Sequence, residues 1–244
     1  MVSPKPWPVE SVVRLFVRLL VCFAAGTLSM SALRLVLGEK AVADSMLNLF
    51  VSVITMQGGV LLVIALFLRE QSASWTQAFG FKNETGWAIV LGICAAVIVL
   101  PAMWLLQKFS MDALAQLGFD VKEQEAVRLL RDAHGLGRQA ILGVMAVVLA
   151  PVAEETFFRG ILYPLAKQNS SRGFALVGVS IFFALIHCNL AIILPLTFLA
   201  VVLALLYEWT NNLLACILVH SLFNAANFVM LFVLKNSGQS PGSP

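Results

Sequence analysis

Two adjacent glutamates and an arginine stand inside a stretch that otherwise has the composition of membrane-spanning helices. They are Glu154, Glu155 and Arg159, and between residues 139 and 234 the only other Lys, Arg, Asp or Glu residues are Lys167, Arg172 and Glu208. A charged side chain at the centre of a bilayer costs roughly 2.5–3.5 kcal/mol on insertion scales, so ionisable groups found there usually belong to functional sites. The sequence therefore predicts a functional site at this cluster.

Helical spacing divides the cluster into a pair and a single carboxylate. Residues four apart share one face of a helix, so Glu155 can meet Arg159, whereas Glu154 lies about 100° away around the helix axis and faces a different neighbour. Pro151, one turn earlier, cannot donate to the carbonyl of Val147, which predicts a kink near the site. An ion pair that only joins helices would explain Glu155 and Arg159 but not the second glutamate. We therefore expect Glu154 to be the chemically available carboxylate.

Polar residues on two later apolar segments are candidates to join this carboxylate. His187 ends the pattern Phe183-x-x-x-His187, and His220 opens the pattern His220-x-x-x-Asn224, whose first and last positions share a helical face. The simpler interpretation is hydrogen bonding between packed helices, which contributes about 0.6 kcal/mol on average in membranes. The third histidine of the chain, His134, lies in a polar connection, where we expect it to be solvated.

A glutamate, two histidines and an asparagine from three helices can hydrolyse an amide bond. A carboxylate in apolar surroundings is a stronger base than one in water, so Glu154 could activate a water molecule, and a neutral histidine can pass the water proton to a leaving amine. A histidine N–H and an asparagine amide can hold the oxyanion of a tetrahedral intermediate, each donor contributing roughly 3–4 kcal/mol in known enzymes. The same residues can also be interpreted as a zinc site made of Glu154, His187 and His220. The sequence has no HExxH metal motif and no GxSxG nucleophile motif, so it favours neither a metal nor a covalent intermediate.

The composition is that of a polytopic membrane protein. Of the 244 residues, 60% are hydrophobic and only 12% are charged, and the mean hydropathy is +0.91, whereas ordinary soluble domains carry about 25% charged residues. The net charge of +3 is small and spread along the chain, so it does not indicate nucleic-acid binding. The four cysteines lack CxxC spacing, which indicates neither a disulfide framework nor a thiolate metal site.

Apolar segments with the approximate length of a bilayer span, about 20 residues, occur along the whole chain. The predicted fold is therefore all-α, a transmembrane helix bundle of about seven spans, with an eighth not excluded. The segments run approximately over residues 12–37, 45–68, 87–107, 139–166, 173–188, 191–208 and 213–234. Glu154 lies on the fourth segment, His187 near the end of the fifth and His220 on the seventh, so the bundle must bring three helices together.

The connection between the third and fourth segments contains an amphipathic stretch over residues 121–131. Ala126, Val127, Leu130 and Ala133 fall on one helical face with charged residues opposite, which predicts a helix lying on the membrane surface. We expect three regions along the chain. They are the N-terminal spans and interfacial connection over residues 1–138, a catalytic helical core over residues 139–234 and a disordered tail over residues 235–244.

Taken in order, the three motifs resemble those of a known family. Glu154-Glu155-x-x-x-Arg159, Phe183-x-x-x-His187 and His220-x-x-x-Asn224 are similar to the EExxxR, FxxxH and HxxxN motifs of the CPBP family, also called Abi or type II CAAX prenyl endopeptidase-like intramembrane proteases. The similarity covers about residues 150–228, and three short motifs in this order on membrane helices are specific. Residues 207–213 also resemble the family, as does, more loosely, the pattern Trp75-x-x-x-Phe79-Gly80-Phe81.

The resemblance implies a role for each site residue. Glu154 would activate water with His187 as its partner. His220 and Asn224 would form the oxyanion site. Glu155 and Arg159 would support these groups. The resemblance favours an enzyme without a bound metal, because asparagine and arginine suit polarisation more than ligation, and zinc or another divalent metal held by Glu154, His187 and His220 is the alternative.

The resemblance also implies a substrate class and a location. Eukaryotic members of the family remove the last three residues of prenylated CaaX proteins, and bacterial-type members are tied to bacteriocin self-immunity, peptide maturation or membrane-protein processing. We therefore expect membrane lipid and a membrane-bound peptide or lipidated protein as partners, no nucleic acid, and a location in the plasma (inner) membrane of a prokaryote. Eight spans are common in the prenyl endopeptidases, so seven spans leave CaaX cleavage itself open.

Two functions of other classes are alternatives to a protease. A non-catalytic membrane scaffold or bacteriocin-immunity-type factor would keep the polar residues for packing alone. A proton-coupled transporter could use glutamate and histidine as a relay, but the sequence shows neither an inverted repeat nor paired broken helices.

Overall fold

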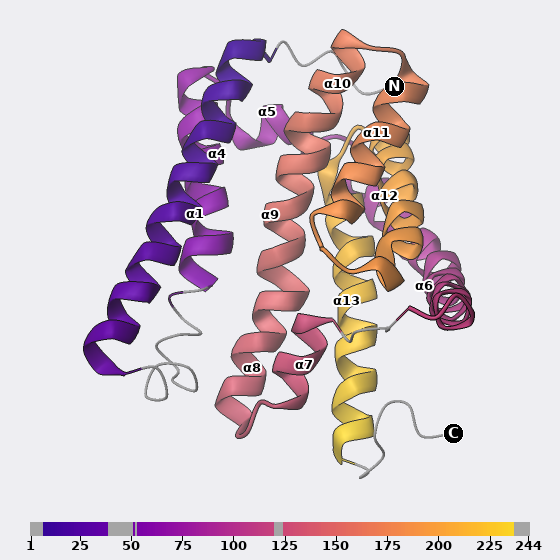
Figure 1. Cartoon of the computed structure of the whole chain (residues 1–244). Coiled ribbons are helices and arrows are strands. Elements are labelled where there is room, and N and C mark those ends of the chain that lie inside the picture. Colours follow the sequence, from indigo (N-terminus) through magenta and orange to yellow (C-terminus); the bar gives the residue numbers. More distant parts are fainter. Residues whose placement is uncertain (1–6, 39–50, 52, 120–123, 237–244) are drawn as a thin grey trace. The chain divides into compact units, whose positions relative to one another are not determined.

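The computed structural model describes residues 7–38, 51, 53–119 and 124–236 (Figure 1). All regular secondary structure in these ranges is helical, which confirms the predicted all-α fold. The chain divides into two compact units between Ala78 and Phe79. The region boundary expected between residues 138 and 139 stays a prediction, and most of the expected tail lies outside the described residues.

Five helices in the described ranges are long and apolar enough to cross a bilayer. They are α1 (Val9–Leu37), α6 (Thr85–Gln116), a continuous helix over Leu136–Asn169, α12 (Leu190–Thr210) and α13 (Leu213–Asn236). These helices correspond to five of the predicted spans and support an integral membrane protein. The fifth predicted span is α11 (Arg172–Leu185), which has only 14 residues and is short for a crossing. The second begins outside the described residues and continues as η1 (Ile54–Gly58) and α4 (Gly59–Glu70), so the number of seven spans is not confirmed.

The unit before Phe79 contains α1, η1 and α4, and it ends in α5 (Trp75–Phe79). A small residue lets α1 approach α4, since a Cβ added to Gly59 would lie 2.5 Å from the sulfur of Cys22. Arg18 and Glu70 form an ion pair of 2.6 Å between the same two helices. None of the predicted site residues lies in this unit.

The helix that carries Glu154 contains two π-helical turns. It runs as α8 (Leu136–Val144), η2 (Met145–Leu149), α9 (Ala150–Phe157), η3 (Phe158–Leu162) and α10 (Tyr163–Asn169). Each π turn ends two residues before a proline, Pro151 or Pro164. A proline has no N–H to donate, and its ring collides with the carbonyl four residues back. A π turn adds one residue before the proline, which moves that carbonyl away from the ring and from the missing donor. The sequence predicted a kink near Pro151. The structure has the π turn η2 there, and the helix continues from it into α9.

Polar caps begin the two helices that follow. Ser171 accepts a hydrogen bond from the N–H of Phe174 at the start of α11, and Asn189 accepts one from the N–H of Ala191 at the start of α12. α12 packs against α6, α11 and α13, while α13 packs against α6, η2 and α9. α13 therefore lies beside the helix that carries Glu154, as Figure 1 shows.

A tight turn between α12 and α13 docks on the residues that precede α6. Gly80 has a φ of +71°, and a Cβ at this position would lie 1.9 Å from the carbonyl oxygen of Asn211. Asn83 donates to the same oxygen over 3.1 Å, and the amide of Asn212 donates to the Asn83 carbonyl over 2.8 Å. Residues 207–213 and the pattern that contains Gly80 also resemble the CPBP family. These two segments therefore contact each other through Gly80 and Asn211.

The predicted surface helix is α7 (Glu125–Arg131), and residues 120–123 before it lie outside the described ranges. α7 packs against α13, and Leu130 and Ala133 are buried. Part of its apolar face is therefore covered by protein. His134, just after it, is exposed as predicted.

Candidate active site

The predicted pair of Glu155 and Arg159 is present and fully buried. Arg159 donates from Nη1 to Glu155 Oε1 over 2.9 Å, and the two side chains are 2% and 0% exposed. Arg159 also donates from Nη2 to the Ala200 carbonyl of α12 over 3.2 Å, and its guanidinium lies 4.6 Å from the centre of the Phe183 ring on α11. Three helices thus hold the positive charge beside Glu155.

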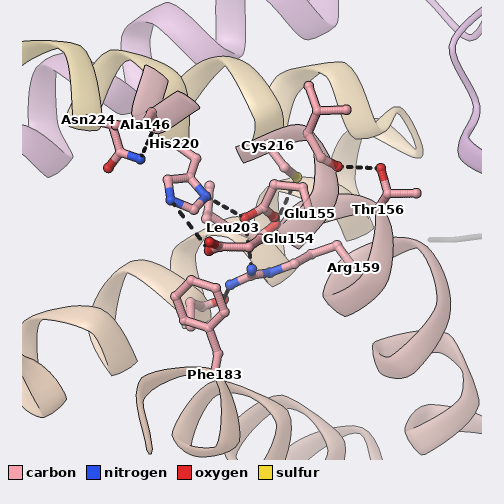
Figure 2. Close-up of polar contacts among 12 residues, drawn as sticks. Ala146, Glu154, Glu155, Thr156, Arg159, Phe183, Leu203, Cys216, His220 and Asn224 are labelled. Atoms are coloured by element: carbon pink, nitrogen blue, oxygen red, sulfur yellow. Dashed lines mark hydrogen bonds and ion pairs between the residues drawn. The ribbon is translucent and has the colours of Figure 1, made fainter. Parts of the chain in front are cut away.

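The imidazole ring of His220 on α13 faces both glutamates (Figure 2). Its Nδ1 is 2.8 Å from Glu155 Oε1, and its Nε2 is 3.9 Å from Glu154 Oε2. An ionised carboxylate can only accept, so a Glu155 that is paired with Arg159 places the hydrogen on Nδ1 and leaves Nε2 facing Glu154. The prediction that the two glutamates face different neighbours is therefore wrong, because the two nitrogens of one imidazole ring reach both.

Both glutamates have an oxygen without a hydrogen-bond partner among the described residues, and Glu154 is the one that is partly exposed. Its Oε2 is buried and has no hydrogen-bond partner in the part of the chain that the structure describes. The side chain as a whole is 28% exposed, so a small molecule can approach it. Such an oxygen can accept a proton without first breaking another hydrogen bond. The contacts agree with the predicted division into a paired and an available glutamate.

His187 lies near the same aromatic ring as His220 but is not bonded to Glu154. Its Nδ1 is 2.8 Å from the Phe183 carbonyl, which can only accept, so Nδ1 carries the hydrogen and Nε2 is left for other partners. The Phe183 ring lies 5.0 Å from the His187 ring and 6.0 Å from the His220 ring. Within the described ranges no hydrogen bond or ion pair links His187 to Glu154. The Glu154–His187 partnership stays a prediction, and Phe183, for which the sequence suggested no role, stands between the histidines.

Asn224 follows His220 by one turn of α13, but its amide bonds to a different helix. Nδ2 donates to the Ala146 carbonyl of η2 over 2.7 Å, as Figure 2 shows. Asn227, three residues further on, accepts a hydrogen bond from the indole N–H of Trp104 over 3.0 Å. Neither bond reaches Glu154, and the oxyanion role of Asn224 stays a prediction.

The residues of the alternative zinc site do not form a ligand set. Among the described residues, no group of three or more His, Cys, Asp or Glu side chains is arranged to hold a metal ion. His187 bonds to a carbonyl of its own helix, and His220 is bonded to Glu155. Both bonds use Nδ1, and histidines that bind a metal through Nε2 commonly make such bonds, so the zinc alternative stays a prediction.

The remaining ionisable residues of the stretch from 139 to 234 form a second cluster, which sequence reasoning missed. Glu208 of α12 is 5% exposed and accepts hydrogen bonds from Tyr163 over 2.9 Å, from Arg172 over 2.8 Å and from Lys167. The cluster joins α10, α11 and α12. The sequence could have indicated this cluster. Glu208, Lys167 and Arg172 are the only other charged residues between 139 and 234, so the carboxylate was a candidate to pair with the two cations.

An apolar groove of 610 Å³ between α6 and α13 is not part of the site. Leu222, Ala226 and Val229 line it. They lie about 180–240° around α13 from His220, so the groove and the glutamates face opposite sides of this helix.

Residues 137–226 match the family model described as Rce1-like, type II CAAX prenyl endopeptidase. This segment is similar to Rce1-like proteases. It extends from α8 into α13 and contains every predicted site residue: Glu154, Glu155, Arg159, His187, His220 and Asn224. No curated protein and no solved structure gives a significant match to the chain. The match agrees with the resemblance to the CPBP family and supports, at the level of the family, an intramembrane CAAX-type protease.

Proposed function

We propose that this protein is an intramembrane endopeptidase that hydrolyses a peptide bond of a membrane-associated substrate, with Glu154 as the base that activates water. The observation that carries the proposal is the partly exposed Glu154, whose unpartnered Oε2 lies 3.9 Å from Nε2 of His220 in the segment that matches the Rce1-like family. An unbonded carboxylate oxygen is unfavourable within packed membrane helices, whereas general-base catalysis needs one. This contrast favours a protease over a non-catalytic scaffold.

Glu154 removes a proton from water while the water oxygen attacks the carbonyl carbon of the substrate peptide bond. The carbonyl π bond opens, and the carbonyl oxygen becomes the oxyanion of a tetrahedral intermediate. When the intermediate collapses, the carbon–nitrogen bond breaks and the leaving amine nitrogen takes up the proton. The products are a carboxyl group and an amine, and Glu154 returns to its ionised form. A positioned general base contributes roughly 10²–10⁴-fold to such a reaction.

The other residues support this step by holding and moving charge. Arg159 donates to Glu155, and Glu155 orients His220 through Nδ1. When His220 is protonated, its Nε2–H can donate to the oxyanion, where a fixed donor is most effective. We assign to His187, whose Nε2 is not used by its bond to Phe183, the role of taking the proton from Glu154 and giving it to the leaving amine.

The proposed substrate is a membrane-bound peptide or lipidated protein, because the site residues lie on or beside helices that are long and apolar enough to cross a bilayer. Membrane lipid surrounds the protein in this proposal, and nucleic acid has no part in it. The proposed location is the plasma (inner) membrane of a prokaryote.

Comparative N-terminal proteomics of membranes tests the proposal. Membranes that contain the wild type, Glu154→Gln or His134→Gln are compared, and the exposed His134 lies outside the site, which makes it a matched control. We expect at least one new N-terminus in the wild-type and His134→Gln membranes that is missing with Glu154→Gln. Identical sets of N-termini in all three membranes would instead support a scaffold or immunity factor.

A further inference from the structure

The π turn before Glu154 leaves one carbonyl group without its usual backbone donor. The N–H of Ala150 donates to the carbonyl of Met145, five residues back, which is the π spacing. In this spacing the Ala146 carbonyl would receive its hydrogen bond from residue 151, but Pro151 has no N–H. In the α spacing its donor would be Ala150, which is already used. An unbonded carbonyl is strongly unfavourable in a membrane-spanning helix, because no water replaces the missing donor.

Asn224 of α13 supplies the missing donor. Its Nδ2 lies 2.7 Å from the Ala146 carbonyl oxygen (Figure 2). α13 is packed tightly against this segment, since a Cβ added to Gly143 would lie 3.0 Å from the Phe228 ring. One N–H of the Asn224 amide thus bonds to the backbone of the helix that carries the glutamates.

The π turn determines the direction in which Glu154 points. One extra residue rotates everything after it by about 100° relative to a continuous α-helix. Glu154 and Glu155 follow the turn directly, and in this rotation they lie 3.9 Å and 2.8 Å from the two nitrogens of His220. A helix that lost the π turn would rotate both carboxylates away from His220.

From these contacts we infer, on the basis of the proposed function, that Asn224 is a positioning residue. Its hydrogen bond to the Ala146 carbonyl keeps the π turn in place, and the π turn keeps Glu154 facing His220. His220 and Asn224 lie one turn apart on the same face of α13, so one helix both contributes the imidazole and fixes the carboxylate that faces it. In this role Asn224 acts through the backbone of η2 and does not donate to the oxyanion.

A double-variant cycle with Pro151→Ala distinguishes the two roles. The alanine restores an N–H at position 151, which can bond to the Ala146 carbonyl in the π spacing and so replace the donor that Asn224 supplies. We expect Asn224→Ala to lower kcat about 10–100-fold in the wild-type background, the usual range for a supporting residue. In the Pro151→Ala background we expect a loss of less than about threefold, because the two positions are coupled.

The same four proteins can be compared by their thermal midpoints of unfolding when a variant cleaves too slowly to assay. We expect Asn224→Ala to lower the midpoint of the wild type clearly and that of Pro151→Ala only slightly. Equal losses in both backgrounds, in kcat and in midpoint, would overturn the inference, because a backbone N–H at position 151 cannot replace an oxyanion donor. Equal cleavage by the wild type and Glu154→Gln would overturn the proposed function instead, and the midpoints alone would then decide whether Asn224 and Pro151 are coupled.

Discussion

Replacing Arg159 with methionine is expected to destabilise the protein far more than the same change at Arg172. Arg159 and Glu155 are 2% and 0% exposed, so the substitution leaves a buried carboxylate with His220 as its remaining partner. Removing one member of a buried ion pair costs about 3–5 kcal/mol, and solvent screens neither side chain here. Arg172 is 58% exposed, and Glu208 keeps Tyr163 and Lys167, so its loss is expected to cost about 0–1 kcal/mol.

Thermal unfolding in detergent, followed by helical circular dichroism, measures this difference between Arg159 and Arg172. In a chain of this size, a change of 1 kcal/mol moves the midpoint by about 2–4 °C. Arg159→Met is therefore expected to lower the midpoint by about 6–20 °C, and Arg172→Met by less than about 4 °C.

A second substitution tests whether the stranded charge is the cause. Combining Glu155→Gln with Arg159→Met removes both charges, while the amide oxygen of the glutamine can still accept from His220. Replacing a buried ion pair with neutral groups of similar size is often close to neutral, so the double variant is expected to regain most of the lost midpoint. The reasoning is refuted if Arg159→Met is no less stable than Arg172→Met, or if the double variant is less stable than the single one.

Gly80→Ala is expected to lower the free energy of unfolding by more than about 1–2 kcal/mol, because Gly80 has a positive φ and a Cβ there would meet the Asn211 carbonyl oxygen. Gly86→Ala is the matched control, since a Cβ there meets nothing within 4 Å, and equal effects would contradict the prediction. Glu208→Leu is expected to cost about 2–4 kcal/mol by stranding its two cations, which keep some contact with water, and an unchanged thermal midpoint would count against the second cluster. A chelator is expected to leave the cleavage rate unchanged, because the proposed mechanism uses no metal. Activity lost to the chelator and restored by zinc would refute that mechanism.

Contacts within one helix could be predicted from the sequence. Glu155 and Arg159 meet because residues four apart share a face, whatever surrounds the helix. The apolar segments that carry the three motifs could be found in the same way, since a bilayer span needs about 20 apolar residues. These local rules separated the glutamate that is paired with Arg159 from the one that is partly exposed, and the catalytic role of the latter stays a prediction.

Contacts between helices could not be predicted, because they depend on how each helix is rotated about its axis. His220 and Glu155 are 65 residues apart, and their bond requires the rotation that η2 introduces. A rotation of 100° per residue holds only for a regular α-helix. A π turn adds one residue, so the predicted directions of all later side chains are wrong by about 100°. The signal that could have revealed it is a proline inside a long apolar helix, which occurs at both Pro151 and Pro164.

The Glu208 cluster shows the same limit for charges that lie far apart in the sequence. Glu208 is 36 residues from Arg172 and 41 from Lys167, and helical spacing relates none of them. Their pairing follows from the packing of α11 against α12, which no local pattern encodes.

The cleavage rate of purified Glu154→Gln in liposomes tests the central claim most directly. The substrate is a peptide that contains a cleavage site found by the membrane proteomics, and the wild type is measured beside it. Since Glu154 Oε2 has no hydrogen-bond partner among the described residues, the substitution is not expected to lower the thermal midpoint. Loss of the base is expected to lower kcat by about 10²–10⁴-fold. A Glu154→Gln protein that cleaves the peptide within about threefold of the wild-type rate would contradict the account.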